Sequence, residues 1–149
     1  MNGGGEIVRM LMFHVDDFSS TITEKGRSKI VEDCDPDRTI RSAESLLILT
    51  SVEKQDEPNP GEISEKAADE IAKLAHQLKV NTIVLHPFAH LFSDLSRPKV
   101  AMETLKLVEG ELARRGFEVI RTPFGWFNTI DLKAKGHPLS RVARTVSLD

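Results

Sequence analysis

Residues 45–52 read Ser-Leu-Leu-Ile-Leu-Thr-Ser-Val, a nearly continuous apolar run. A β-strand that is covered on both faces carries such a run, whereas a half-exposed strand alternates apolar and polar residues. We therefore predict that residues 45–52 form a buried strand of a sheet. Two more short strands are predicted farther along the chain, at residues 82–85 and 117–121.

Helical signals fill the two intervals between these strands. Asn59 is suited to cap a helix, Pro60 to its first position, and Glu62 to the position that completes a capping box. Apolar residues at helical spacing follow them. A second helix is predicted from about Arg97 to Arg115, and Gly116 tolerates the left-handed conformation that ends many helices.

The order strand–helix–strand–helix–strand predicts three parallel strands, because such crossovers are right-handed. The carboxyl ends of parallel strands meet at one edge of the sheet, and ligands of open α/β sheets bind in the crevice there. Residues 52–54, 86–91 and 122–126 follow the three strands. We expect a ligand pocket between these three segments.

The remaining elements are predicted on both sides of this unit. Residues 7–15 read as a buried strand, Asp16-Asp17 as a turn, and residues 18–23 as a second strand. Residues 25–42 are polar and are interpreted as a loop, and residues 127–132 as another strand. The predicted fold class is α/β, with one domain over residues 1–149 that contains a mixed β-sheet and crossover helices.

Composition narrows the class of protein. The 149 residues suffice for one domain with a core, and 40% hydrophobic with 29% charged residues is ordinary for a globular protein. Apolar runs stay far below the ~20 residues of a membrane span, and the start lacks a signal-peptide pattern. With a single cysteine, Cys34, a reducing cytoplasm is the simplest expectation.

Charge is unevenly distributed along the chain. Residues 1–96 hold 10 basic and 17 acidic side chains, and residues 97–149 hold 10 and 6, so the two parts carry −7 and +4 and together −3. The basic part could face RNA phosphates, although a solvated surface of mixed charge is the simpler interpretation.

Two histidines four residues apart, His86 and His90, follow the second predicted strand. A zinc pair at that spacing needs a helix, and Pro87 argues against one, so we expect no metal. We predict a structural role for His86, in which it bonds to the backbone, and a functional role for His90 at the ligand edge.

The segment 124–128, Phe-Gly-Trp-Phe-Asn, is the second candidate. Gly125 indicates a tight bend or a close backbone approach. Two of its three aromatic residues are predicted to lie in the core, and Asn128 could orient a substrate amine or a water molecule. The segment 135–139, Lys-Gly-His-Pro-Leu, is a turn with basic flanks, either surface structure or an RNA contact.

Five motifs stand in a specific order and spacing. They are Ser51-Val52-Glu53-Lys54, His86-Pro87-Phe88-Ala89-His90-Leu91, Pro98 with Val100-Ala101, Pro123-Phe124-Gly125-Trp126 and Lys135-Gly136-His137-Pro138-Leu139. With these motifs the chain resembles the N-terminal editing domain of archaeal threonyl-tRNA synthetases, over roughly Arg9 to Val146. This resemblance implies a fold like that of D-aminoacyl-tRNA deacylases and hydrolysis of seryl-tRNA(Thr), with no cofactor.

The resemblance also implies a set of site residues. The pocket for the aminoacyl-adenosine end would be lined by Val52, Pro87, Phe88, Ala89, His90, Ala101 and Phe127. Catalytic positions would be His90, Asn128 and Arg141. In better-known members the positions of Phe127, Asn128 and Arg141 usually hold tyrosine, lysine and an acidic residue. An amide and a guanidinium cannot move protons at pH 7, so we expect the substrate's terminal 2′-OH to assist hydrolysis here.

Two rival functions remain at this stage. One is a D-aminoacyl-tRNA deacylase, and the other is a non-catalytic module of a threonyl-tRNA synthetase that binds tRNA ends. The expected partners are the 3′ end of serine-charged tRNA(Thr), a synthetase catalytic chain and a second copy of the chain. The homodimer is expected because an exposed sheet edge invites strand pairing.

Overall fold

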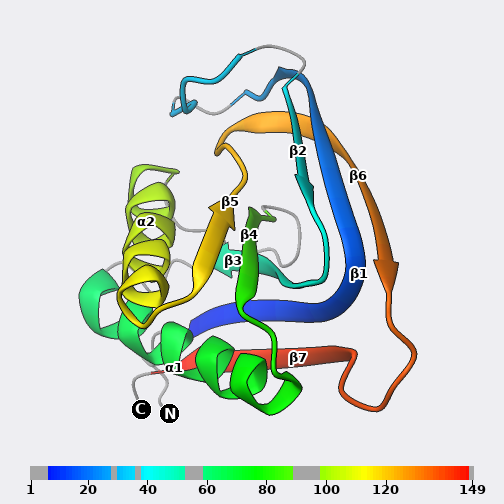
Figure 1. The fold of residues 1–149 in the computed structure, drawn as a ribbon. Coiled ribbons are helices and arrows are strands. Elements are labelled where there is room, and N and C mark those ends of the chain that lie inside the picture. The colour runs from blue at the N-terminus through cyan, green and yellow to red at the C-terminus, as the bar shows by residue number, and fades with distance from the viewer. Residues whose placement is uncertain (1–6, 28–29, 36–37, 53–58, 89–97, 148–149) are drawn as a thin grey trace.

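The computed structural model describes residues 7–27, 30–35, 38–52, 59–88 and 98–147 (Figure 1). Within these ranges seven strands and two helices form a single α/β unit. In chain order they are β1 (Ile7–Lys25), β2 (Thr39–Ser42), β3 (Ser45–Val52), α1 (Pro60–Leu78), β4 (Thr82–Pro87), α2 (Pro98–Arg114), β5 (Glu118–Arg121), β6 (Trp126–Ala134) and β7 (Arg141–Ser147).

The predicted parallel unit is confirmed. Strand β3 pairs in parallel with β4, and β4 in parallel with β5. All other pairings involve β1 and are antiparallel, so the sheet is mixed. The first half of β1 lies between β3 and β7, and the second half of β1 lies between β2 and β6.

The predicted turn at Asp16-Asp17 is wrong, because β1 runs through it as one strand of 19 residues. Its pairing with β6 skips one residue between Val15 and Asp17, which is a bulge. A bulge bends a strand and increases its twist without ending it. As a result β1 curls over the rest of the sheet, as Figure 1 shows.

Two strands lie where none was predicted. Strand β2 falls inside the predicted loop 25–42, and only Ile40 of its four residues is buried. Strand β7 carries two arginines, and Val146 is buried while Val142 is partly so. Backbone pairing with β1 holds both strands in place. One is short and the other is polar, so neither has a pattern of apolar residues that predicts a strand.

Helix α1 begins as predicted. The Asn59 side chain accepts a hydrogen bond from the Glu62 backbone N–H (3.2 Å) and donates one to the Glu62 carboxylate (2.9 Å). The helix ends at Lys79, which has the left-handed φ of 59°. Gly116, with φ 95°, follows α2 in the same conformation. Neither helix is long and apolar enough to cross a membrane among the residues that the structure describes.

Buried strand β3 separates two cores. Leu46 and Ile48 pack with the helices in the larger cluster, whereas Leu47 and Leu49 pack on the opposite face with Phe18. Two right-handed crossovers in one direction place both helices on the same face, and the curled half of β1 covers the other face. This explains why residues 45–52 are buried at every position.

Candidate functional site

A pocket of about 640 Å³ lies at the carboxyl ends of β3 and β4, beside α2 and the segment between β5 and β6. All three segments that were predicted to meet at this edge contribute to it. The lining residues are Gly26, Arg27, Thr50, Ser51, Val52, His86, Pro87, Phe88, Pro98, Ala101, Leu105, Pro123, Phe124, Gly125, Trp126, Phe127 and Asn128. Its volume falls within the range of small-molecule sites.

The end of β3 brings two hydroxyl groups to this pocket. Thr50 and Ser51 are 3% and 2% exposed, and neither hydroxyl has a hydrogen-bond partner in the described part of the chain. The Thr50 carbonyl accepts a hydrogen bond from the Phe88 N–H (3.0 Å), which holds the end of β4 at the pocket. Buried polar groups are normally paired. Each of these hydroxyl oxygens has less than 1 Å² of exposed surface, so a ligand in the pocket would pair with them only after a local rearrangement that opens them.

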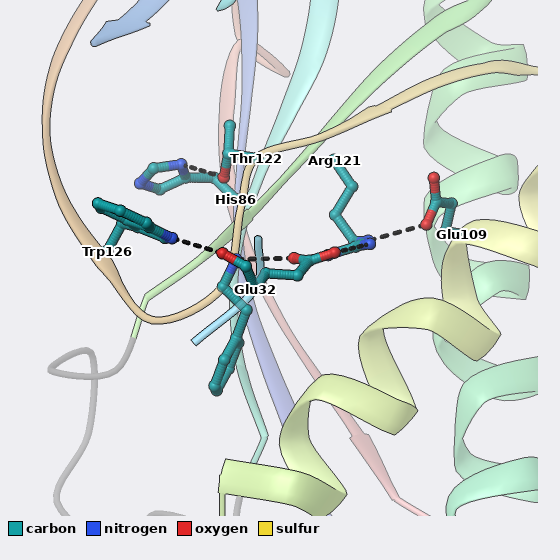
Figure 2. A network of polar contacts seen from close by, with 7 residues as sticks. Glu32, His86, Glu109, Arg121, Thr122 and Trp126 are labelled. Carbon is teal, nitrogen blue, oxygen red and sulfur yellow. Dashed lines mark hydrogen bonds and ion pairs between the residues drawn. The ribbon is translucent and has the colours of Figure 1, made fainter. Parts of the chain in front are cut away.

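His86 lies in the floor of the pocket and is 4% exposed. Its Nδ1 atom is 2.8 Å from the Thr122 hydroxyl (Figure 2), so this nitrogen pairs with a side chain, whereas the sequence predicted a backbone partner. Burial lowers the pKa of His86 to about 4. The imidazole is therefore neutral and a weak base at pH 7.

An aromatic wall, which we define as Phe124, Gly125 and Trp126, runs from the segment after β5 to the first residue of β6. Gly125 has φ 89°, and a Cβ atom there would lie 2.6 Å from the Ile30 carbonyl oxygen. The predicted tight bend and close backbone approach are thus confirmed. The prediction of core aromatics is wrong, since Phe124 and Trp126 are only partly buried, Phe127 is 48% exposed, and all three line the pocket.

Six of the predicted site residues line the pocket: Val52, Pro87, Phe88, Ala101, Phe127 and Asn128. Ala89 and His90 lie outside the described residues. The Asn128 amide donates a hydrogen bond to the Trp126 carbonyl (3.3 Å), which orients it at the start of β6. The structure thus brings the predicted substrate-binding positions together from four separate parts of the chain.

Arg141 is not brought to the pocket. It is exposed at the start of β7 opposite Phe13, whereas Asn128 lies opposite Ile22. Those two partners are nine positions apart on β1, and each position of a strand advances the chain by about 3.3 Å. Asn128 and Arg141 therefore do not form a catalytic pair within one copy of the chain.

Gly26 and Arg27 are lining residues that the sequence interpretation missed. They lie in the segment interpreted as an outer loop. Gly26 reaches the pocket because its backbone N–H donates a hydrogen bond to the Gly125 carbonyl (2.7 Å). This hydrogen bond and the adjacent pairing of Lys25 with Trp126 place them. Both contacts join residues far apart in sequence, and no local pattern marks them.

The turn at residues 135–139 has a structural role at the bend of β1. His137 Nε2 is 2.8 Å from His14 Nδ1, and His14 Nε2 is 2.9 Å from the Glu44 carboxylate. Lys135 forms an ion pair with Asp16 (2.5 Å). These side chains attach the turn to the sheet, and in the described ranges no three His, Cys, Asp or Glu side chains group as metal ligands.

The fold and the pocket together define an α/β domain with a pocket of small-ligand size at the carboxyl edge of its parallel strands. The family follows from comparison with known proteins. The chain belongs to the archaea-specific editing domain of threonyl-tRNA synthetase, whose family model matches residues 8–146.

Threonine–tRNA ligases of several archaea are similar to this chain. The protein of Methanopyrus kandleri is 44% identical over 140 residues, or 94% of this chain. Those of Thermococcus kodakarensis and Methanocaldococcus jannaschii are each 42% identical over 139 residues, or 93% of it. The chain spans 22% of the length of each of these three relatives, so it corresponds to one part of such a ligase.

Proposed function

We propose that the chain hydrolyses the ester of L-seryl-tRNA(Thr), a proofreading reaction. Membership of the editing-domain family and the pocket of about 640 Å³, large enough for an amino acid on a nucleoside, support this. Proofreading is needed because the synthesis site discriminates poorly between the two amino acids. Serine lacks only one methyl group of threonine, and a site for the larger residue rejects the smaller one by only ~1–3 kcal/mol. A second site that excludes threonine sterically reverses this bias.

We further propose that the terminal 2′-OH of the substrate assists the attacking water. The single observation that carries this is the character of the described polar groups at the pocket, which position a substrate better than they move protons. They are the Thr50 and Ser51 hydroxyls, the Asn128 amide, the Arg27 guanidinium and a neutral, buried His86. Positioning alone can lower a reaction barrier by several kcal/mol. The 2′-OH of the terminal ribose lies next to the scissile ester and is the polar group nearest to it.

Deacylation of seryl-tRNA(Thr) by the isolated chain tests the first proposal, with threonyl-tRNA(Thr) as the control that should survive. The same assay with a tRNA that ends in 2′-deoxyadenosine tests the second. We expect seryl-tRNA(Thr) to be consumed and its 2′-deoxy analogue to persist. Equal rates on the two serine substrates would remove the 2′-OH from the mechanism and leave the editing function intact.

The role of Asn128 in the reaction gives a more local test. Because its amide can orient a group but cannot act as a base, we expect Asn128→Ala to lower kcat/KM less than ~100-fold. A loss on the order of 10⁴-fold would show that Asn128 is needed for the chemical step itself. The measurement is steady-state deacylation of seryl-tRNA(Thr) by both proteins.

A non-catalytic domain that binds charged tRNA ends is the second candidate. It is favoured by the separation of Asn128 from Arg141 and by the hydrogen bond of the Asn128 amide to a backbone carbonyl. Binding of a seryl-adenosine analogue without turnover of seryl-tRNA(Thr) would support it. A D-aminoacyl-tRNA in the same assay separates both candidates from a deacylase that selects by chirality.

Partners and location belong to the same proposal. Because the chain spans 22% of its relatives, we expect it to act with a threonyl-tRNA synthetase catalytic chain. Strand β7 pairs only with β1 among the described strands, and a second copy could add to its outer edge. Light scattering of the purified chain measures the proposed homodimer. The cytoplasmic location stays a prediction from cysteine content.

A further inference from the structure

Glu32 connects a segment without regular secondary structure to the aromatic wall of the pocket. Its backbone N–H donates to the Phe124 carbonyl (3.0 Å), and its backbone carbonyl accepts from the Trp126 indole N–H (2.7 Å). Its carboxylate accepts from the Phe124 N–H (2.9 Å). Glu32 therefore uses its N–H, its carbonyl and its side chain on two residues that line the pocket (Figure 2).

Arg121, at the carboxyl end of β5, fixes that carboxylate. Its two terminal nitrogens are 2.6 and 2.7 Å from the two Glu32 oxygens, and its Nε is 2.8 Å from Glu109 of α2. The Arg121 side chain is 11% exposed, and bidentate pairs of this kind are strong and directional. The hydrogen bonds from Arg121, and then that from Phe124, hold the pKa of Glu32 below its usual value although burial opposes them.

Two glycines allow the backbone of this segment to approach the backbone of the wall closely. A Cβ atom at Gly26 would lie 2.6 Å from the Gly125 carbonyl oxygen, and one at Gly125 would lie 2.6 Å from the Ile30 carbonyl oxygen. The backbone at Gly125 is thus in direct contact with the backbones at Gly26 and Ile30. A displacement of Glu32 is transmitted to Phe124 and Trp126 because no flexible side chain separates them.

We infer that Glu32 is a positioning residue of the pocket: by holding Phe124 and Trp126 in place, it sets the affinity for the aminoacyl-nucleoside end of the substrate. The identity of that ligand rests on the proposed function. Glu32 itself lies outside the pocket lining, so it acts through the wall and not on the reacting atoms.

Glu111 offers a matched control for a test of this role. Like Glu32 it pairs with arginine, namely Arg114 and Arg115, but on the surface of α2 and outside the pocket lining. We would compare Glu32→Ala and Glu111→Ala for binding of seryl-adenosine with an amide in place of the ester, for deacylation of seryl-tRNA(Thr), and for emission of Trp126, the only tryptophan.

For Glu32→Ala we expect the Kd of the analogue to rise about 10-fold or more, because small misplacements at a site are costly. KM should rise more than kcat falls. Alanine keeps the backbone carbonyl that accepts from the Trp126 indole, but without the carboxylate this carbonyl is expected to move away, so the Trp126 emission should shift to the red. Glu111→Ala should leave all three unchanged, even if it lowers the unfolding temperature as much. A variant that merely unfolds more easily would lower the active fraction and leave KM and Kd unchanged.

Wild-type Kd, KM and emission in Glu32→Ala would overturn the inference. If that variant does not fold, Glu32→Gln decides, because its amide oxygen still accepts from Phe124 but the bidentate pair is lost; we expect a smaller change in the same direction. If the unaltered chain neither binds the analogue nor deacylates seryl-tRNA(Thr), the proposed function fails. The Trp126 emission then still decides whether Glu32 holds the wall.

Discussion

The lowered pKa of His86, a residue of the pocket lining, makes the free energy of unfolding of the chain depend on pH. The unfolded imidazole takes up a proton near pH 6.5, whereas burial lowers the pKa of the folded one to about 4. Between these values the unfolded state binds more protons, so the free energy of unfolding falls as the pH falls. We expect a loss of up to roughly 3 kcal/mol over this window.

The measurement is urea unfolding at several pH values between 4 and 8, on the unaltered chain and on His86→Gln. The variant should show a shallower decline above pH 4.5, where the carboxylates are still largely ionised. Above pH 7 the two curves should run parallel, since His86 is neutral in both the folded and the unfolded state. Parallel curves over the whole range would contradict a buried neutral imidazole.

The Thr50 hydroxyl is expected to oppose stability and to favour binding. It is buried without a described partner, and such a group costs about 1–3 kcal/mol. Thr50→Val keeps the shape, so we expect unchanged or higher stability together with weaker binding of the seryl-adenosine analogue. Calorimetric titration and thermal unfolding measure the two effects.

Ser45 is the control for this substitution. Its hydroxyl is equally buried and without a described partner, but it lies at the opposite end of β3 and outside the pocket lining. Ser45→Ala should therefore leave binding unchanged. If Thr50→Val binds the analogue as well as the unaltered chain does, the Thr50 hydroxyl has no part in recognition.

At the scale of elements, the contact of Gly26 and residues 30–32 with the aromatic wall depends on Gly125. Alanine at that position would combine a positive φ with a Cβ atom 2.6 Å from the Ile30 carbonyl oxygen. We expect Gly125→Ala to lower the free energy of unfolding by about 1–3 kcal/mol. Urea unfolding measures the change, and binding of the analogue should weaken as the wall moves.

Gly110 provides the opposite case within the same chain. It lies inside α2, and a Cβ atom there meets nothing within 4 Å. Gly110→Ala should raise the free energy of unfolding by about 0.5–1 kcal/mol, because alanine favours the helix. Equal effects of the two substitutions would mean that the backbone contact at Gly125 adds no constraint.

The elements that the sequence predicts are those with local signals. The cap at Asn59 marks α1, and the apolar run at 45–52 marks β3 as buried on both faces. Strand β2, strand β7 and the unbroken course of β1 depend on pairing across the sheet, which no window of sequence contains. The turn at Asp16 was predicted because two acidic residues favour a turn as much as a bulge.

At the scale of the molecule, the edge of the pocket could be predicted from the order of strands and helices, and most of its lining from the family motifs. The contribution of Gly26, Arg27 and Glu32 to the pocket could not be predicted from the sequence. Glu32 and Arg121 are 89 positions apart, and a glutamate in a polar stretch gives no sign of its partner. Arg141 was placed by family resemblance alone, and the structure puts it at the start of β7, opposite Phe13 of β1 and away from the pocket lining.

The pairing of β1 with β7 determines how the molecule would respond to mechanical load. Ile7 lies opposite Ser147, and the ladder runs to Phe13 opposite Arg141 (Figure 1). Tension applied at residues 7 and 147 would open these backbone hydrogen bonds one after another, as in a zipper. With the handle moved from residue 7 to Asp17, beyond the other end of the ladder, the same bonds would be loaded together in shear. In optical-tweezers measurements we expect the first geometry to yield at clearly lower force, beginning at the corner where the first and last strands meet.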